Sequence, residues 1–299
     1  MEKNSFLKTL TENNIEIKNN VCLKELTTFK IGGEAEMFIT VKDEGQAVFV
    51  KKTADKYNVP LFVLGKGSNL LVSDNGLKGA TLSLELNHVI FNGNIVTCGA
   101  GLTLQKLCVL AMDNGLSGLE FAFGIPGSVG GAIYMNAGAY GGEMADCVVS
   151  AKYIDDAGNI KTVSREDMAL GYRTSIFKNS GYIITEATFL LKEGKREEIL
   201  GKMNGFMGRR KEKQPLEFAS AGSTFKRPEG YFAGALIEKN GLKGKRVGDA
   251  MVSEKHAGFV VNCGSATSKD VKELIEIIRK TVYENDGVNL EPEVIFVGE

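Results

Sequence analysis

The sequence predicts a protein of two domains in which short β-strands and hairpins are mixed with α-helices. Its 299 residues leave room for roughly two domains and a substantial core. Apolar and polar residues alternate over residues 89–98 around Asn92-Gly93, as in a β-hairpin. A charged helical segment, KEGKREEILGKMNGFMGRRKEK, then marks a change in composition, and we take it as the hinge into a second domain from about residue 194.

Composition and charge exclude several classes of protein. The formal net charge is −1 and no block of like charge occurs, so we expect neither a nucleic-acid nor a membrane partner. The first 14 residues are too polar for a signal peptide, and the five widely spaced cysteines are typical of reduced cytosolic thiols. Two histidines cannot supply a zinc cluster, so we expect no metal, and any difficult redox chemistry needs a bound cofactor.

Local patterns predict the elements of both domains. Residues 1–22 are expected to form a polar helix and lead-in, residues 23–193 the first domain and residues 194–299 the second. In the first domain we expect a strand after Gly32-Gly33, a helix over 44–58 that Pro60 ends, strand–turn–strand segments over 60–84, hairpins over 89–98 and 147–163, a helix that Thr103 caps, and a strand over 182–191. In the second we expect a helix near 231–239, a strand over 257–262, a helix over 269–285 capped by Ser268, and a last strand over 293–297.

One stretch, residues 115–142, is unusually rich in glycine, with nine glycines around Pro126. Crowded glycines favour a backbone that takes positive φ or approaches another group closely. The stretch therefore suits contact with a flat or anionic ligand, with N–H groups pointing at it. A run of tight turns between strands is the alternative, and the composition leaves both open.

A second glycine loop, Gly65-Lys66-Gly67-Ser68-Asn69-Leu70, follows an expected strand, and Glu85 lies downstream at a distance suited to a ribose contact. The Rossmann interpretation fails, because the third glycine is missing and LLVSDNG predicts a strand and turn rather than a helix. A loop that holds a pyrophosphate and a plain turn both remain possible.

Three short segments of the second half carry candidate chemistry. Arg173 stands in GYRTS, and its planar fork suits a carboxylate or phosphate, although it is equally consistent with a surface arginine. Ser223 lies among small residues in SAGSTFK, but it lacks a nucleophile elbow and a base placed by sequence, so a structural serine is the main alternative to a reactive one. Glu293 stands in LEPEV, where an exposed strand entry is the alternative.

Taken together, six segments resemble the UDP-N-acetylenolpyruvoylglucosamine reductase (MurB) family over nearly the whole chain. They are TTFKIGG, LGKGSNLLVSD, GIPGSVGGAIYMNAGAYGGE, GYRTSIFK, AGSTF and LEPEV, in that order. The resemblance implies an α+β fold, with a two-part FAD-binding domain of the PCMH (vanillyl-alcohol-oxidase) type followed by an α+β substrate-binding domain. It also implies non-covalent FAD, because no matching attachment position is present.

The resemblance places the site residues as follows. The FAD-binding positions are Gly65, Lys66, Gly67, Ser68, Asn69, Leu70 and Leu71 around the pyrophosphate, and Gly124, Ile125, Pro126, Gly127, Ser128, Gly130, Gly131, Asn136, Ala137 and Gly138 along the rest of the cofactor. The catalytic trio maps onto Arg173, Ser223 and Glu293. Lys213, Lys226 and Arg227 are the candidate substrate-binding residues; either lysine suits the substrate diphosphate or eases proton loss from Ser223.

The reaction that the resemblance implies is the reduction of an enolpyruvyl ether on UDP-N-acetylglucosamine to UDP-N-acetylmuramate, a cytosolic step of peptidoglycan precursor synthesis, with NADPH as hydride donor. Arg173 would pair with the substrate carboxylate, Ser223 would give a proton to the carbanionic carbon, and Glu293 would donate a hydrogen bond to the enolate, which requires burial to raise its pKa.

Two departures from relatives stand out. The chain has no room after Phe189 for the inserted loop that brings a tyrosine over the substrate in one branch, so it matches the short form; Arg227 stands where many relatives have asparagine. We expect a monomer that binds a small UDP-sugar. The alternatives are another flavin oxidoreductase on the same scaffold, such as a carbohydrate or alcohol oxidase, and a non-catalytic nucleotide-binding module.

Overall fold

The computed structural model describes residues 2–298. The chain divides into two compact units, each made of separate stretches of sequence. Unit 1 comprises Met1–Lys18, Met37–Lys66 and Gly79–Arg210, and unit 2 comprises Asn19–Glu36, Gly67–Lys78 and Lys211–Glu299. The domains expected from the sequence, residues 1–22, 23–193 and 194–299, are continuous segments, whereas each unit combines separate stretches of the chain. The expected domains stay a prediction.

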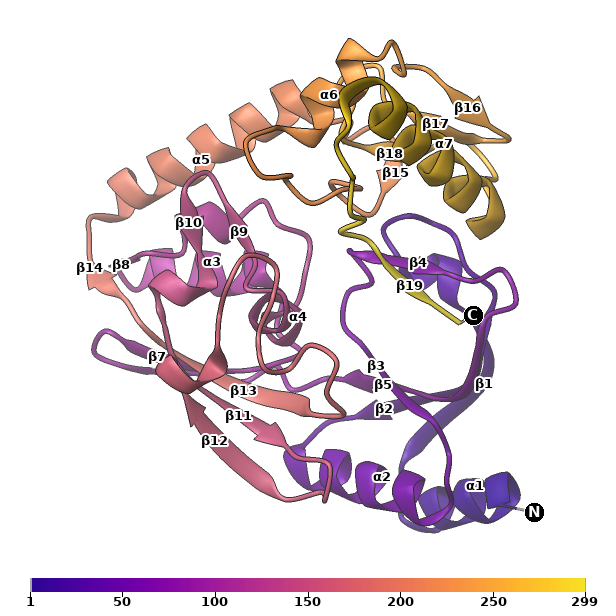
Figure 1. The fold of residues 1–299 in the computed structure, drawn as a ribbon. Helices are drawn as coiled ribbons and strands as arrows, with labels where there is room; N and C mark the ends of the chain where they lie inside the picture. The colour runs from indigo at the N-terminus through magenta and orange to yellow at the C-terminus, as the bar shows by residue number, and fades with distance from the viewer. Residues whose placement is uncertain (1, 299) are drawn as a thin grey trace. The chain divides into compact units, whose positions relative to one another are not determined.

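The first part of unit 1 is built on a four-stranded sheet of order β1-β2-β5-β3. Helices α1 and α2 lie beside each other next to this sheet (Figure 1), and Phe6, Leu10 and Val50 of the helices share a core with Ile39 and Leu82 of the strands. The elements are α1 Glu2–Glu12, β1 Glu16–Cys22, β2 Glu34–Val41, α2 Glu44–Lys56, β3 Leu61–Leu64 and β5 Leu77–Leu84.

The expected helix and lead-in over residues 1–22 divides into a helix and a strand. Helix α1 ends at Glu12, and Asn14 takes a positive φ of 55° that helices do not continue through. Strand β1 follows from Glu16. The prediction is therefore right for the helix over 2–12 and wrong for a helical continuation to residue 22, while Met1 lies outside the described residues.

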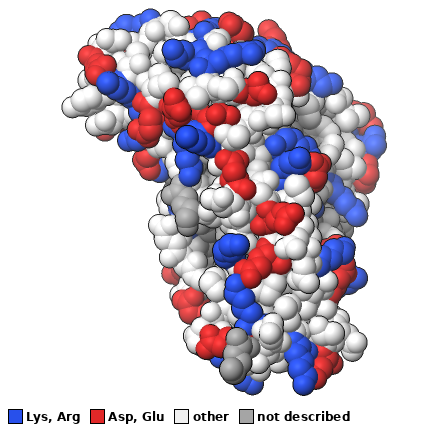
Figure 2. Space-filling model, turned by 90° about the vertical axis from the view of Figure 1, so that its right-hand side faces the viewer, with Lys and Arg blue, Asp and Glu red and all other residues white. Residues whose placement is uncertain are grey.

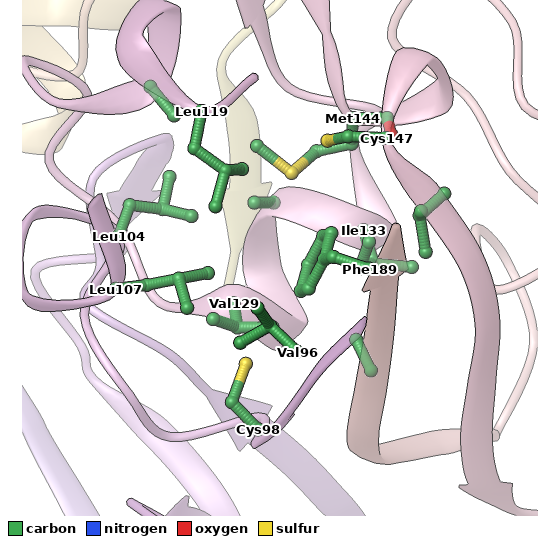
Figure 3. Close-up of a cluster of buried hydrophobic side chains, with 14 of the residues drawn as sticks. Val96, Cys98, Leu104, Leu107, Leu119, Val129, Ile133, Met144, Cys147 and Phe189 are labelled. Atoms are coloured by element: carbon green, nitrogen blue, oxygen red, sulfur yellow. The ribbon is translucent and has the colours of Figure 1, made fainter. Parts of the chain in front are cut away.

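The second part of unit 1 is a five-stranded antiparallel sheet of order β12-β11-β13-β7-β6, which confirms both expected hairpins. Helices α3 and α4 bury their apolar side chains with it: Figure 3 shows Leu104 and Leu107 of α3 and Ile133 of α4 near Val96 of β7 and Phe189 of β13. The elements are β6 Val89–Asn92, β7 Ile95–Gly99, α3 Leu104–Asp113, β8 Leu116–Ser117, α4 Val129–Tyr134, β9 Gly138–Ala139, β10 Gly142–Glu143, β11 Val148–Ile154, β12 Ile160–Ser164, β13 Ile183–Leu190, β14 Lys192–Glu193 and α5 Arg196–Lys213.

Three of the five cysteines fill this core. Cys98, Cys108 and Cys147 are buried, and burial raises the pKa of Cys98 and of Cys147 to about 12. Because the thiolate is the reactive form, these three thiols are inert at neutral pH. These three cysteines are thus unpaired and fill the core, while their redox state stays a prediction.

Unit 2 is built on a four-stranded antiparallel sheet of order β15-β18-β17-β16, with helix α7 packed on it. Val271, Leu274, Ile275, Ile278 and Val282 form the apolar stripe of α7 at helical spacing. A separate strand pair, β4 with β19, runs parallel. The elements are β4 Leu70–Val72, β15 Ala219–Ser220, α6 Ala233–Lys239, β16 Arg246–Val247, β17 Ala250–Val252, β18 Val260–Asn262, α7 Ser268–Asp286 and β19 Ile295–Val297.

The N-cap of α7 is Thr267 and not Ser268. The Thr267 hydroxyl accepts from the Asp270 N–H, and the Asp270 carboxylate accepts from the Thr267 N–H, which is a capping box. Ser268 is the first helical residue, and its hydroxyl donates to Asp74 at 2.7 Å. The prediction of Ser268 as the N-cap was wrong because Thr267 and Ser268 are both typical N-cap residues. Only Thr267 has an acidic residue, Asp270, three positions later.

Charges of both signs are spread over the surface. Figure 2 shows basic and acidic side chains interspersed across the face that it presents, in keeping with a net charge of −1. Within residues 2–298, no helix is both long enough and apolar enough to cross a bilayer.

A buried carboxylate, Glu120, closes the loop after α3 and gives a first prediction. Its oxygens accept from the Ser117 hydroxyl at 2.6 Å and from the Gly118 N–H at 2.7 Å, and only 7% of the residue is exposed. Burial alone raises the pKa of Glu120, but these hydrogen bonds outweigh it and lower the pKa. Glu120→Gln replaces one acceptor by a donor, so we expect it to lower the free energy of unfolding by about 1–3 kcal/mol at pH 7.

Because folding lowers the pKa of Glu120, the stabilisation by its carboxylate is fully present above the unfolded-state pKa. It is lost as the pH falls through the folded-state pKa. Urea unfolding of the wild type, Glu120→Gln and the exposed control Glu229→Gln, at neutral pH and below about pH 4, measures it. The deficit of Glu120→Gln should shrink at low pH. A deficit of equal size at both pH values, or one matched by Glu229→Gln, contradicts the assignment.

Candidate functional site

The loop between β3 and β4, Gly65–Asn69, is an anion cradle of the kind that backbone N–H groups form. Within residues 2–298, the N–H groups of Lys66, Gly67, Ser68 and Asn69 have no hydrogen-bond acceptor. Gly67 has a φ of +58°, and a Cβ there would lie 2.5 Å from the Leu26 carbonyl oxygen. Consecutive open N–H groups on a glycine turn fit a pyrophosphate, and the strand β4 that follows confirms that the loop is not of the Rossmann type.

The glycine stretch 115–142 continues into helix α4, whose first turn is internally satisfied. The Ser128 hydroxyl accepts from Gly131 N–H, while the N–H groups of Val129 and Gly130 donate to the Leu102 and Ala100 carbonyls. The N–H groups of Gly127 and Ser128 have no acceptor within residues 2–298. The N–H of Gly124 likewise has no acceptor among the described residues, so within Gly124–Gly131 a backbone hydrogen bond to an anion can come from Gly124, Gly127 and Ser128.

The two glycine loops meet inside unit 1. A Cβ on Gly65 would lie 2.9 Å from the Ser128 hydroxyl, so only glycine fits at that distance. This close approach places the first residue of the Gly65 loop against the cap of α4. The two segments that the sequence singles out as cofactor loops thus form one surface at this point.

Arg173 lies on a tight loop that two polar side chains anchor. Asn136 is fully buried; its side-chain N–H donates to the Gly171 carbonyl at 3.0 Å and its oxygen accepts from Ala145 N–H. On the other side, the Ser175 hydroxyl donates to the Tyr134 carbonyl at 2.8 Å. Arg173 itself has a φ of 55°, a conformation that non-glycine residues adopt rarely.

The guanidinium of Arg173 points back to the glycine stretch. One N–H donates to the Gly138 carbonyl at 3.2 Å, and the group lies 5.2 Å from the centre of the Tyr172 ring. Arg173 and the predicted cofactor position Gly138 are thus in direct contact. The Asn136 side chain is engaged within the protein and its backbone N–H donates to the Ile133 carbonyl, so its part in the site is to hold Gly171.

In unit 2, the segments that carry Ser223 and Glu293 pair with each other. Glu293 N–H donates to the Thr224 carbonyl at 2.8 Å, and Lys226 N–H donates to the Glu291 carbonyl at 2.8 Å, so the two segments pair as adjacent extended chains. Ser223 is exposed and Glu293 is half-buried. Both segments were predicted from short motifs, and their pairing is what a shared site requires.

Asn69 connects the Gly65 loop to Glu293. Its side-chain N–H donates to the Glu293 carbonyl at 3.1 Å, and its own carbonyl accepts from Ile295 N–H. The parallel pairing of β4 with β19, which places Leu70 opposite Ile295, continues this contact. Arg173 belongs to the other unit, and its proximity to Ser223 and Glu293 stays a prediction.

The basic candidates differ in their surroundings. Lys226 is largely buried and forms an ion pair with the exposed Glu291. The Arg227 guanidinium lies 4.1 Å from the centre of the Phe232 ring, which holds it over an aromatic face. Lys213 is exposed at the end of α5. Their roles toward a substrate stay predictions.

The fold defines a flavin-binding class of protein. Residues 35–164 match the family model of the FAD binding domain, and cholesterol oxidase from Brevibacterium sterolicum shares the fold, with a TM-score of 0.50 at 16% identity over 60% of this chain and 38% of that protein. The expected two-part FAD-binding domain corresponds to the two sheets of unit 1, and an α+β region follows it.

The closer matches identify the family. Residues 214–297 match the C-terminal domain of UDP-N-acetylenolpyruvoylglucosamine reductase. The reductases of Lachnoclostridium phytofermentans and Clostridium novyi are 51% and 50% identical, over 94% and 95% of this chain and 92% and 93% of their own lengths. The MurB crystal structure from Thermus caldophilus is 40% identical with a TM-score of 0.81, over 95% of this chain and 99% of that one. The chain belongs to the UDP-N-acetylenolpyruvoylglucosamine reductase family.

Proposed function

We propose that this chain reduces the enolpyruvyl ether of a UDP-N-acetylglucosamine derivative to the lactyl ether of UDP-N-acetylmuramate, in peptidoglycan precursor synthesis. Family membership over nearly the full length carries the reaction class, and FAD is its cofactor. NADPH is the hydride donor of the family. Bound FAD supplies the relay that takes a hydride from NADPH and delivers it to the substrate.

A single structural observation supports the chemistry most directly: the pairing of the Ser223 and Glu293 segments. Their backbones are joined by the hydrogen bond between Glu293 N–H and the Thr224 carbonyl. This pairing fixes a hydroxyl and a carboxyl group on neighbouring extended chains. Such a pair can give a proton to one atom of a substrate and a hydrogen bond to the next.

The proton balance assigns the role of Ser223. Hydride addition to the methylene carbon of the enolpyruvyl group leaves a carbanion on the adjacent carbon, stabilised as an enolate by the carboxylate. The Ser223 hydroxyl gives its proton to that carbon, which completes the C–H bond, and Ser223 regains a proton from solvent. The carbanion is a strong enough base for a hydroxyl to serve as its acid.

We assign Arg173 and Glu293 to the stabilisation of the negative charge that develops on the substrate. The guanidinium fork of Arg173 pairs with the substrate carboxylate, where the enolate charge accumulates. Glu293 in its protonated form donates a hydrogen bond to the enolate oxygen. The anchored loop around Arg173 supports this assignment, because a preorganised cation costs little reorganisation during the reaction.

The phosphates have two sets of candidate partners. The open N–H groups of Lys66, Gly67, Ser68 and Asn69 fit the FAD pyrophosphate. We assign Gly65, Leu70 and Leu71 to the same part of the cofactor, and Gly124–Gly131 and Asn136–Gly138 to the rest of it. Lys213, Lys226 and Arg227 are assigned to the diphosphate of the sugar nucleotide. The proposal also includes a monomer that works in the cytoplasm, where nucleotide-sugar precursors are made.

The first test is the flavin itself. The purified protein should be yellow, and acid or heat denaturation should release the flavin as free FAD into the supernatant. A colourless protein that takes up no added FAD contradicts the proposal and every flavoenzyme alternative with it. Yellow colour that stays in the pellet contradicts non-covalent attachment.

A further inference from the structure

The TTFKIGG segment, residues 27–33, connects the Gly65 loop to the turn that carries Ser223. Gly67 of the loop, this segment and Ser223 all belong to unit 2. On the side of the loop, the N–H of Thr28 donates to the Gly67 carbonyl at 3.2 Å. A Cβ on Gly67 would lie 2.9 Å from Cα of Thr27, so only glycine fits against the segment at this point.

On the side of Ser223, the same residue is hydrogen-bonded to the backbone of Ser220, three positions before Ser223. The Thr28 hydroxyl donates to the Ser220 carbonyl at 2.7 Å, and the Thr28 carbonyl accepts from the Ser220 N–H at 3.1 Å. The two residues are 192 positions apart in the chain. Thr28 therefore contacts the backbone of Gly67 and the backbone of Ser220 at the same time.

Apolar packing supports this connection. Phe29 is buried in the core of unit 2 together with Leu71, which follows the Gly65 loop. Ala221 and Phe225, which flank Ser223 in the sequence, belong to the same core. Ser223 itself is exposed, so its neighbours are held in the core while its hydroxyl stays open to a substrate.

The far end of the Ser223 turn is held at Thr224. Its N–H donates to the Gly258 carbonyl at 2.8 Å, and its hydroxyl accepts from the Val260 N–H at 2.8 Å. Between the two ends, Gly222 has a φ of 77°, and a Cβ there would meet no atom within 4 Å. No packing holds the middle of the turn at this residue, so the position of Ser223 depends on how the two ends are held.

We propose that Thr28 is a positioning residue for the proton transfer, and that its hydroxyl fixes the Ser223 turn relative to the Gly65 loop. The inference rests on the proposed function, because a flavin held at the loop and a proton given by Ser223 must meet at one substrate. The pairing of β15 with β18 places Ser220 within its own sheet, whereas the hydrogen bonds of Thr28 relate Ser220 to the loop. A displacement of about 1 Å between reacting groups can slow a reaction by about 10²-fold.

The test is Thr28→Val, which keeps the shape of the side chain and removes the hydroxyl. The backbone hydrogen bonds to Gly67 and Ser220 remain, so FAD binding and flavin reduction by NADPH should stay within about threefold of wild type. Reoxidation of the reduced flavin by the enolpyruvyl sugar nucleotide should slow by about tenfold, because the proton donor is displaced. Thr28→Ser keeps the hydroxyl and should bring this rate back to within about threefold of wild type.

The matched control is Thr281→Val. It removes a hydroxyl–carbonyl hydrogen bond from another half-buried threonine of unit 2, where Thr281 donates to the Ile277 carbonyl at 2.8 Å within α7. We expect neither half-reaction to change in this variant, because α7 has no contact with the Ser223 turn through that hydroxyl.

A second background separates positioning from damage to the fold. Once Ser223→Ala has removed the proton donor, Thr28→Val should slow reoxidation by no more than about twofold further, whereas a damaged fold slows both backgrounds alike. The proposal is wrong if Thr28→Val reoxidises at the wild-type rate, slows both half-reactions equally, is not rescued by Thr28→Ser, or loses as much in the Ser223→Ala background. If the sugar nucleotide does not reoxidise the wild-type protein, the proposed function itself is wrong and this inference fails with it.

Discussion

Replacing Ser223 by alanine should separate the two halves of the reaction. We expect Ser223→Ala to be reduced by NADPH at close to the wild-type rate, because the proton that Ser223 supplies is needed only after hydride has reached the sugar. Reoxidation of the reduced protein by the enolpyruvyl sugar nucleotide should slow by about 10²–10⁴-fold, the usual contribution of a positioned general acid. Stopped-flow absorbance of the flavin measures both steps.

Ser223 is exposed, and its hydroxyl forms no hydrogen bond among the described residues, so we expect Ser223→Ala to fold as the wild type does. Ser220→Ala, three residues earlier at the end of β15, is the control and should leave both half-reactions unchanged. An equal loss in both half-reactions of Ser223→Ala contradicts the role as proton donor.

The second large effect is expected at Arg173. Arg173→Lys keeps the positive charge and the same difficulty with positive φ, but it loses the planar fork. We expect sugar reduction to fall by about 10²–10³-fold with a raised KM for the sugar nucleotide, because the fork pairs with the substrate carboxylate in the ground state and with the growing enolate charge in the transition state.

Flavin reduction by NADPH should again stay near wild type in Arg173→Lys. The control is Arg196→Lys, at an exposed arginine paired with Asp113, which should change neither half-reaction. If Arg173→Lys retains wild-type kinetics with the sugar nucleotide, the pairing of Arg173 with the substrate carboxylate is wrong. If it loses flavin instead, the contact with Gly138 serves the cofactor and not the substrate.

Much of the fold was predictable because its signals are local. Alternation with Asn92-Gly93 or Asp156-Ala157-Gly158 at the turn defined both hairpins, and Thr103 at the start of an apolar run defined α3. The boundary within residues 1–22 was missed because a polar helix and a polar edge strand differ little in composition. The distinguishing feature is the left-handed Asn14, which no pattern of hydrophobicity reveals.

The sequence predicted which segments form the site, but not which hydrogen-bonding groups in them are open to a ligand. Glycine content marked residues 115–142, yet tertiary contacts with Ala100 and Leu102 decide that Val129 and Gly130 have no open N–H group. Asn136 was assigned to the cofactor, and its side chain instead holds the Arg173 loop. The sequence did not reveal the role of Ser175, because its hydroxyl donates to a carbonyl 41 residues away and such a contact leaves no local pattern.

The measurement that tests the central claim most directly is the pair of half-reactions on the wild-type protein without oxygen. NADPH should bleach the flavin absorbance, and addition of the enolpyruvyl ether of UDP-N-acetylglucosamine should restore it with one lactyl ether formed per flavin. Flavin that is bleached by NADPH but not restored by this sugar nucleotide would contradict the account and leave another flavin oxidoreductase on the same scaffold.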